Sequence, residues 1–224
     1  MKKYKNHTKK ELLNIFELML TSRKLDEKQL ILLKQGKGFF HIGASGHEAV
    51  QIAASKAMDP NIDFAYPYYR NQAFCLAHGM TVKDMLLSFM AKEEDPNSGG
   101  RQMPQHFGHK ELNIVSQSSP TGTQYLQATG AAFAIKRDKT KGVVYVSSGE
   151  GTTSQGDYHE ALNWASREKA PVIFHVENNG YAISVPIDEQ TAGSSIYKIS
   201  AGYENLHRIR IDGTDYFESL LAFK

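Results

Sequence analysis

The sequence is short of cysteine, with only Cys75 among 224 residues. A single cysteine cannot form an internal disulfide, which excludes small disulfide-stapled scaffolds and fits a reducing compartment. No run of about 18 apolar residues is present, so we expect no membrane-spanning helix. The basic N-terminal segment MKKYKNHTKKELLNIF lacks the apolar stretch and small-residue cleavage site of a signal peptide. These absences together predict a cytoplasmic protein.

The sequence also has little net charge and few ready-made site motifs. A net charge of +2 is too small to indicate nucleic-acid binding. No C-x-x-C or H-E-x-x-H pattern supports a zinc site, and no phosphate-binding G-x-x-x-x-G-K-[ST] loop is present. Gly149-x-Gly151 is followed by Ser154 where a dinucleotide fingerprint requires glycine. The composition itself, 41% hydrophobic and 22% charged, is typical of a folded globular protein.

The N-terminal part, residues 1–92, is predicted to be helical. Thr8 and Glu11 form a capping-box pattern, and apolar residues then recur at helical spacing as far as the breaker Gly36. Thr81 and Asp84 repeat the capping-box pattern further along the chain. Beyond the first helix, the predicted helices cover residues 46–58, 69–78 and 81–92.

The remainder of the chain combines a long loop with alternating strands and helices. Residues 93–123 are rich in Gly, Pro, Ser and His but hold apolar side chains, which favours an ordered binding loop over a disordered one. Predicted elements then follow as a helix at 125–136, a strand at 142–147, a helix at 158–168, a strand at 172–176 and a third strand around Ile209 and Ile211. This alternation predicts an α/β fold with a parallel sheet flanked by helices. We expect one domain, residues 1–224, with 124–224 as its βαβ core.

Two predicted strands end in residues that can bind a cation and a phosphate. Glu150 follows the first strand between two glycines, and Asn178 and Asn179 follow the second. Parallel strands bring such ends to one edge of the sheet, where ligands bind. Carboxylate and amide oxygens suit Mg²⁺, and the N-terminus of the helix near Gly156 suits a phosphate. The residues alone leave open whether these side chains hold a magnesium diphosphate or only cap and turn the strand ends.

A resemblance to a known family narrows this choice. The chain carries Gly100-Arg101-Gln102-Met103-Pro104-x-His106-Phe107-Gly108, Ser118-Ser119-Pro120-x-x-Thr123-Gln124, Gly149-Glu150-Gly151 and Asn178-Asn179-Gly180-Tyr181-Ala182-Ile183-Ser184-x-Pro186. In this order the motifs resemble the alpha chain of thiamine-diphosphate-dependent 2-oxo acid dehydrogenases, and the Glu-containing variant resembles the branched-chain type most. The resemblance implies a thiamine-diphosphate-binding fold with a helical N-terminal region, and 93–123 as a cofactor-binding loop.

The resemblance also implies ligands for the cofactor. The Glu150 carboxylate, the Asn179 side chain and the Tyr181 carbonyl would hold Mg²⁺. The remaining implied contacts are Gly151, Thr152, Tyr69 and Arg70 for the diphosphate, Ser119 and Thr121 for the aminopyrimidine, and Ser118, Thr123 and Gln124 for a monovalent cation such as K⁺. For that cation site, ordinary hydrogen bonding within the loop is the alternative.

Several positions depart from the family pattern or have two interpretations. Thr121 replaces a bulky aliphatic residue, Tyr68 replaces a more usual Gln, and Glu177 stands where some members have Arg. His106 is a candidate catalytic acid–base or substrate-contact group, because its pKa class suits that work. The competing interpretation is a structural histidine that loop carbonyls satisfy.

The implied chemistry is oxidative decarboxylation of a 2-oxo acid, with acyl transfer to the lipoyl group of an acyltransferase partner. The family's active site lies between alpha and beta chains of an alpha2-beta2 assembly, and the aminopyrimidine-activating glutamate belongs to the beta chain. Residues 216–224 read like a helix that is just starting, so we expect a shortened chain, an incomplete gene product or the N-terminal part of a fused alpha–beta protein. The isolated chain is therefore expected to be inactive.

Three alternatives stay open at this point. The first is a pyruvate or acetoin dehydrogenase-type alpha chain, whose close similarity leaves the substrate undecided. The second is a transketolase-type thiamine enzyme. The third belongs to another class, a non-catalytic scaffold that binds a partner and no cofactor.

Overall fold

The computed structural model describes residues 7–224, which form two compact units interleaved along the chain. Among the described residues, the first unit comprises 7–59, 69–112 and 211–224, and the second comprises 60–68 and 113–210. These units do not coincide with the parts 1–92, 93–123 and 124–224 expected from the sequence. Residues 60–68 lie within the predicted helical part but belong to the second unit, and residues 211–224 lie within the predicted βαβ core but belong to the first. The single domain over 1–224 stays a prediction.

The first unit is helical. It contains α1 (Lys9–Lys34), α2 (Glu48–Lys56), α3 (Gln72–His78), α4 (Val82–Phe89) and α9 (Tyr216–Phe223), with a 3-10 turn at Lys110–Leu112. Both predicted capping boxes are present, at Thr8–Glu11 and Thr81–Asp84. The core of this unit joins α1, α2, α3 and α9 through buried apolar residues that include Ile15, Ile52 and Leu220. The helical N-terminal part is thus confirmed.

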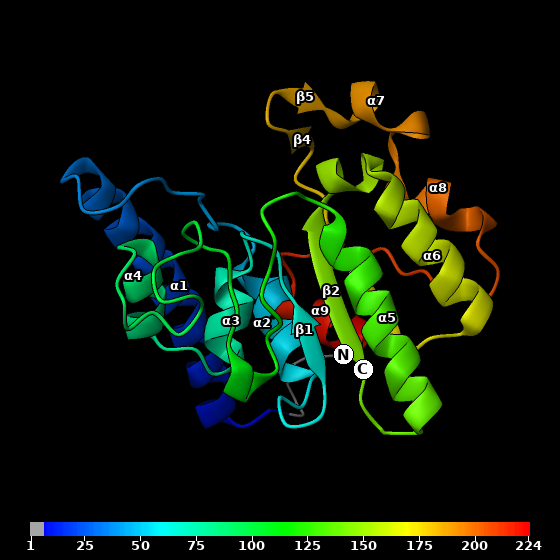
Figure 1. Cartoon of the computed structure of the whole chain (residues 1–224), viewed down its shortest axis with the longest axis horizontal. Coiled ribbons are helices and arrows are strands. Elements are labelled where there is room, and N and C mark those ends of the chain that lie inside the picture. The colour runs from blue at the N-terminus through cyan, green and yellow to red at the C-terminus, as the bar shows by residue number, and fades with distance from the viewer. Residues whose placement is uncertain (1–6) are drawn as a thin grey trace. The chain divides into compact units, whose positions relative to one another are not determined.

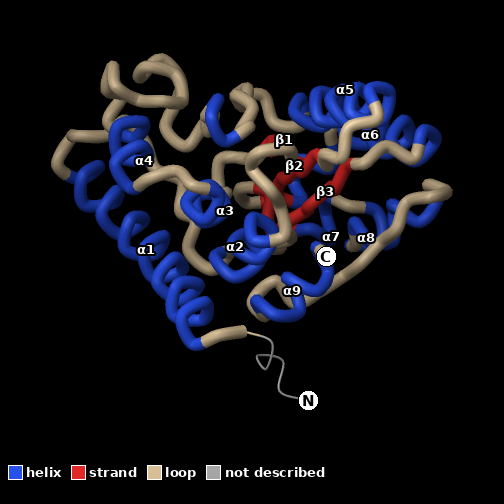
Figure 2. The backbone as a smooth tube through the Cα atoms, turned by 90° about the horizontal axis from the view of Figure 1, so that it is seen from below, coloured by secondary structure: helices blue, strands red, loops and turns tan. Residues whose placement is uncertain are grey.

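The second unit is built on a parallel sheet of the order β1-β2-β3, with β1 (Phe64–Tyr66), β2 (Val144–Gly149) and β3 (Val172–Glu177). The helices α5 (Thr123–Asp138) and α6 (Gly156–Glu168) lie side by side over one face of this sheet (Figures 1 and 2). Buried residues such as Tyr125, Ala128, Val146 and Leu162 fill the layer between helices and sheet. The α/β fold class with a parallel sheet is therefore confirmed.

The rest of the second unit forms short elements after β3. They are β4 (Tyr181–Ala182), β5 (Val185–Pro186), α7 (Ile187–Gln190) and α8 (Ile196–Ile199), together with the 3-10 turns Glu150–Ser154, Ala192–Ser194 and Ser200–Gly202. The strands β4 and β5 pair as a small antiparallel hairpin, which the sequence did not indicate.

The predicted third strand around Ile209 and Ile211 is wrong. Residues 206–212 form no strand, and 52% of the Ile209 side chain is exposed. A lone apolar alternation does not make a strand where no neighbour supplies hydrogen bonds and no core covers the apolar face. The third strand of the sheet is β1 instead, whose partner in β2 lies 80 positions along the chain (Phe64 opposite Val144). Within residues 7–224, no helix is long and apolar enough to span a lipid bilayer.

The buried face of α5 gives a stability prediction. Gly130 lies on the exposed side of this helix, and a Cβ there would meet no atom within 4 Å, whereas Ala132 is fully buried. We expect Gly130→Ala to raise the free energy of unfolding by about 0.5–1 kcal/mol, because Ala restricts the unfolded chain. Ala132→Leu should lower it by about 1–3 kcal/mol through overpacking. Urea unfolding measures both, and equal effects at the two sites would contradict this packing.

Candidate functional site

The register of β2 and β3 brings together the two strand ends that are followed by Glu150 and by Asn178 and Asn179. Gly149 at the end of β2 pairs with Glu177 at the end of β3, so the residues after each strand emerge at the same edge of the sheet. Glu150 opens the 3-10 turn Glu150–Ser154, which we call the acidic turn, and this turn leads directly into α6. The backbone N–H of Asn179 donates to Glu150 Oε2 at 3.1 Å. Topology therefore joins residues that stand 29 positions apart.

Glu150 is fully buried but only partly satisfied. Its exposed fraction is 0%, and among the described residues no donor reaches its second carboxylate oxygen, Oε1. Leaving a charged oxygen buried without a partner is costly, unless a cation supplies the missing charge. No cluster of three or more His, Cys, Asp or Glu side chains within residues 7–224 could hold a metal by itself. A cation here would need the Glu150 carboxylate together with neutral oxygens and ligand oxygens.

The segment after β3 folds back over the acidic turn. Asn179 forms an Asx turn, in which its Oδ1 accepts from the Tyr181 N–H at 3.2 Å. Tyr181 itself is 60% exposed at the start of β4. Ala182, the next residue, lies against Gly151, where an added Cβ would come within 2.7 Å of the Ala182 Cβ. Gly151 is therefore required by close packing of two backbone segments rather than by an unusual backbone angle.

The start of α6 offers backbone donors beside this turn. Gln155 is the N-cap of α6 and makes no side-chain capping hydrogen bond, while Thr152 just before it is buried. Uncapped N–H groups at the N-terminus of a 13-residue helix favour an anion. Gly122, which precedes α5, also lies here, since a Cβ added to it would be 3.0 Å from Gln155 Cβ and 3.6 Å from Thr152 Cγ2.

The predicted monovalent-cation residues are only partly convergent. The hydroxyls of Ser118 and Thr123 share a hydrogen bond, and Thr123 also donates to the Pro120 carbonyl at 3.1 Å. The Gln124 side chain instead accepts from Gly122 N and donates to the Ser147 carbonyl at 3.2 Å. Its amide is thus committed to the end of β2. Ser119 and Thr121 are exposed on the same loop.

Two of the three departures from the family pattern, Tyr68 and Glu177, are hydrogen-bonded to each other. The Tyr68 hydroxyl donates to Glu177 Oε2 at 3.0 Å, and both residues are buried. His175 Nδ1 lies 3.7 Å from Glu177 Oε1 and 2.8 Å from the Tyr145 hydroxyl. These residues form a largely buried polar network that extends along the sheet to Glu177 at the carboxyl end of β3.

The remaining candidates belong to the first unit. Arg70 donates from Nη1 to the Gly43 carbonyl, its Nε is buried without a partner among the described residues, and it lies 5.6 Å from the Tyr69 ring centroid. His106 is buried with Nδ1 3.1 Å from the Pro104 carbonyl, a contact of the kind that a structural histidine makes. Burial raises the pKa of the Cys75 thiol, which is fully covered as expected.

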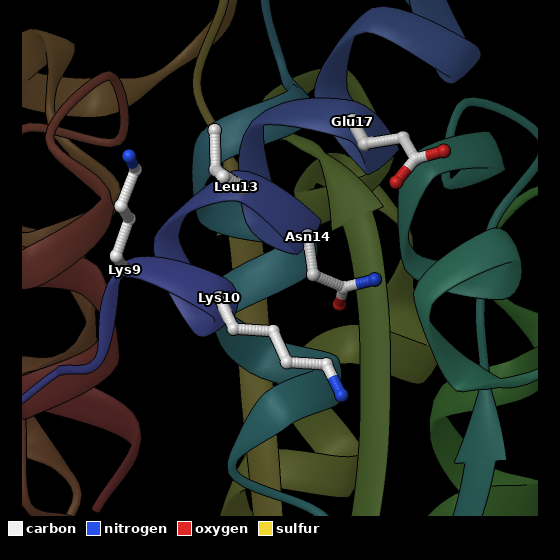
Figure 3. Close-up of a pocket in the computed structure, with 5 residues that line it drawn as sticks. All are labelled: Lys9, Lys10, Leu13, Asn14 and Glu17. Atoms are coloured by element: carbon white, nitrogen blue, oxygen red, sulfur yellow. The ribbon is translucent and has the colours of Figure 1, made fainter.

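A hollow on α1 has no comparable chemistry. It is lined by Lys9, Lys10, Leu13, Asn14 and Glu17 on the first turns of the helix. In Figure 3 Lys9 and Leu13 extend to one side, and Lys10, Asn14 and Glu17 extend to another. No polar groups converge there, so we assign it no ligand.

Comparison with known proteins gives the family. The model of the family described as "Dehydrogenase E1 component" matches residues 16–224. The chain belongs to the dehydrogenase E1 component family. This confirms the resemblance found in the sequence motifs.

Individual relatives point to the branched-chain type. The chain is 45% identical to the 2-oxoisovalerate dehydrogenase subunit alpha of Bacillus subtilis (strain 168), over 97% of this chain and 66% of that protein. It is 40% identical to the mitochondrial subunit alpha of Caenorhabditis elegans, over 81% of this chain and 42% of that protein. The human mitochondrial subunit alpha is 35% identical, over 96% of this chain and 48% of that protein. The chain thus spans less than two thirds of the length of these relatives.

Sequence reasoning missed two residues of the site. Ala182 stood inside a recognised motif without a stated role, and its small side chain is what lets the segment approach Gly151. Gln190 on α7 donates to the Gly151 carbonyl at 2.8 Å, and its neighbours in sequence carry no motif that signals this contact. Only the folded hairpin brings it there.

The Gly151–Ala182 contact yields a prediction with an internal rescue. Gly151→Ala should lower the free energy of unfolding by about 1–3 kcal/mol, because the new Cβ collides with Ala182. In an Ala182→Gly background the same substitution should cost much less, since the colliding methyl group is gone. Gly156→Ala is the matched control, because a Cβ there meets no atom within 4 Å. Denaturant unfolding of the four variants measures the coupling, and additive costs would contradict the contact.

Proposed function

We propose that this chain is the alpha-chain part of a thiamine-diphosphate-dependent branched-chain 2-oxo acid dehydrogenase and that the acidic turn holds its magnesium diphosphate. The observation that carries the proposal is the buried Glu150 carboxylate, which has one oxygen on Asn179 N–H and the other without a partner among the described residues. The relatives named 2-oxoisovalerate dehydrogenase subunit alpha favour a branched substrate over pyruvate or acetoin.

The donor set fits Mg²⁺ in its chemistry. One carboxylate oxygen of Glu150, the amide oxygen of Asn179 and a main-chain carbonyl such as that of Tyr181 are hard oxygen ligands, and diphosphate oxygens would add to them. Two buried carboxylates, Glu150 and Glu177, lie at this edge of the sheet. An anionic diphosphate would be repelled by them unless a divalent cation came with it. The site therefore favours the metal and the diphosphate together.

Each residue of this chain has a holding or orienting role in the proposal. Gly151 and Thr152, with the uncapped start of α6, receive the diphosphate, and Tyr69 and Arg70 are proposed as further contacts to it. Thiamine diphosphate, when bound, supplies the carbanion chemistry that decarboxylates a 2-oxo acid. Other proposed contacts are Ser119 and Thr121 for the aminopyrimidine, Ser118, Thr123 and Gln124 for K⁺ or another monovalent cation, and His106 as a catalytic group.

Partners and location complete the proposal. We infer that a beta chain, separate or fused, completes an alpha2-beta2 assembly, and that a lipoyl-bearing acyltransferase receives the acyl group. Nucleic acid and membrane are not partners in this proposal. The single buried cysteine supports a reducing, cytoplasmic setting, although several relatives are described as mitochondrial.

The metal assignment is tested at Glu150. In an assembly with a beta chain, Glu150→Ala should abolish Mg²⁺-dependent binding of thiamine diphosphate, because it removes the charged side chain proposed to bind the metal. Glu160→Ala, an exposed carboxylate on α6 of the same unit, is the matched control and should bind normally. Isothermal titration calorimetry with and without Mg²⁺ measures the affinities. Unchanged affinity in Glu150→Ala would show that the metal site lies elsewhere.

The division of labour between chains is tested by turnover. The purified chain alone should not decarboxylate 2-oxoisovalerate, because the aminopyrimidine-activating glutamate is proposed to come from the beta chain. Adding a beta chain should restore decarboxylation, which is measured as the release of CO₂. Measurable turnover by the chain alone would refute this division, and a preference for pyruvate would refute the branched-chain assignment.

A further inference from the structure

The segment of residues 179–190, which we call the return segment, is fastened to the acidic turn at three points. Its first residue, Asn179, donates its backbone N–H to Glu150 at 3.1 Å. In its middle, Ala182 packs on Gly151. At its end, Gln190 reaches back to the same turn through its side chain. The hairpin β4–β5 and α7, which are labelled in Figure 1, make up most of this segment, and β4 and α7 contact the acidic turn.

The Gln190 amide is aimed at backbone and hydroxyl acceptors of the turn. Its Nε2 lies 2.8 Å from the Gly151 carbonyl and 2.9 Å from Ser154 Oγ, with the Glu150 carbonyl further away at 3.4 Å. A carbonyl oxygen can only accept, so the amide must present its nitrogen on this side. The two N–H groups of one amide match the two short distances.

The amide nitrogen of Gln190 is hydrogen-bonded to the acidic turn, whereas its amide oxygen is not hydrogen-bonded to any described residue. Its Oε1 is buried and has no hydrogen-bond partner among the described residues, although the side chain as a whole is only half-buried. Burying an amide oxygen without a hydrogen-bond partner lowers the free energy of unfolding. The donated hydrogen bonds are therefore the contribution that this side chain makes, and they fall on the residues that follow Glu150.

We propose that Gln190 is a positioning residue for the magnesium–diphosphate site, an inference that rests on the proposed function. By holding the Gly151 carbonyl and Ser154, it fixes the acidic turn against the return segment. The turn carries Glu150, and the return segment carries Asn179 and Tyr181. Gln190 thus keeps the two halves of the metal-ligand set at one spacing, while touching none of the reacting groups itself.

Substitutions at two adjacent positions of α7 test this role. Gln190→Glu keeps the shape but replaces the donor nitrogen with an acceptor oxygen, and Gln190→Met removes the donor without adding charge. Glu189→Gln changes the exposed neighbour and is the matched control. Each variant is assembled with a beta chain. Hydrogen–deuterium exchange then follows the backbone amides of residues 150–156, calorimetry measures thiamine diphosphate affinity at several Mg²⁺ concentrations, and thermal unfolding reports global stability.

We expect both Gln190 variants to speed exchange in the acidic turn and to weaken Mg²⁺-dependent thiamine diphosphate binding on the order of tenfold, the size expected for losing a buried hydrogen-bond donor. Saturating Mg²⁺ should recover part of the affinity, which a purely global loss of stability would not produce. Glu189→Gln should match the wild type.

The outcomes separate this inference from the proposed function. Failure of the wild-type assembly to bind Mg²⁺ and thiamine diphosphate would overturn the proposed function, and the exchange rates would then decide alone whether Gln190 fixes the turn. Normal binding and normal exchange in both Gln190 variants would overturn the positioning role. Unchanged exchange of the turn in both variants, together with a loss of thermal stability, would also overturn it, because that pattern marks a residue that only stabilises the fold.

Discussion

One hydrogen bond ties the site to the fold: the Asn179 backbone N–H donates to the buried carboxylate of Glu150. It exists because β2 and β3 run parallel, in the register that sets Gly149 opposite Glu177. A shift of one residue in that register would reverse the faces of every side chain on β3 and separate the two strand ends. The core under α5 and α6, which fixes the register, is therefore also what fixes the site.

The turn that carries Glu150 holds several features that do not stabilise the fold. A buried carboxylate with one oxygen free, a glycine packed on an alanine methyl, and an uncapped helix start all occur within residues 150–156. Each is unfavourable or neutral for folding alone, and all face one edge of the sheet. Natural sequences depart from local folding rules mostly at sites that bind or react. The concentration of departures in this turn is the physical ground for proposing a ligand there.

Local signals in the sequence were enough for much of the fold. The capping boxes at Thr8 and Thr81 fix helix starts through contacts three residues apart. The strand–helix–strand run from 144 to 177 is marked by two short runs rich in β-branched residues on either side of a helix. The strand β1 escaped prediction because it has three residues and gains its identity from β2, far along the chain. The apolar pair Ile209 and Ile211 led to a wrong strand prediction for the opposite reason. The local alternation is present there, but no neighbouring strand pairs with it in the described structure.

For the candidate site, the sequence motifs predicted which residues are involved, and the parallel pairing of β2 and β3 brings them close together. Gln190 could not be predicted, since its contact depends on how the hairpin β4–β5 turns the chain back. The departures at Tyr68 and Glu177 look independent in the sequence, being 109 positions apart, yet their side chains are hydrogen-bonded to each other. The phenol of Tyr68 therefore satisfies a buried carboxylate at this edge of the sheet. Glu177 places a second buried carboxylate beside that of Glu150. Under the proposed function, this second carboxylate makes diphosphate binding depend more heavily on a bound cation.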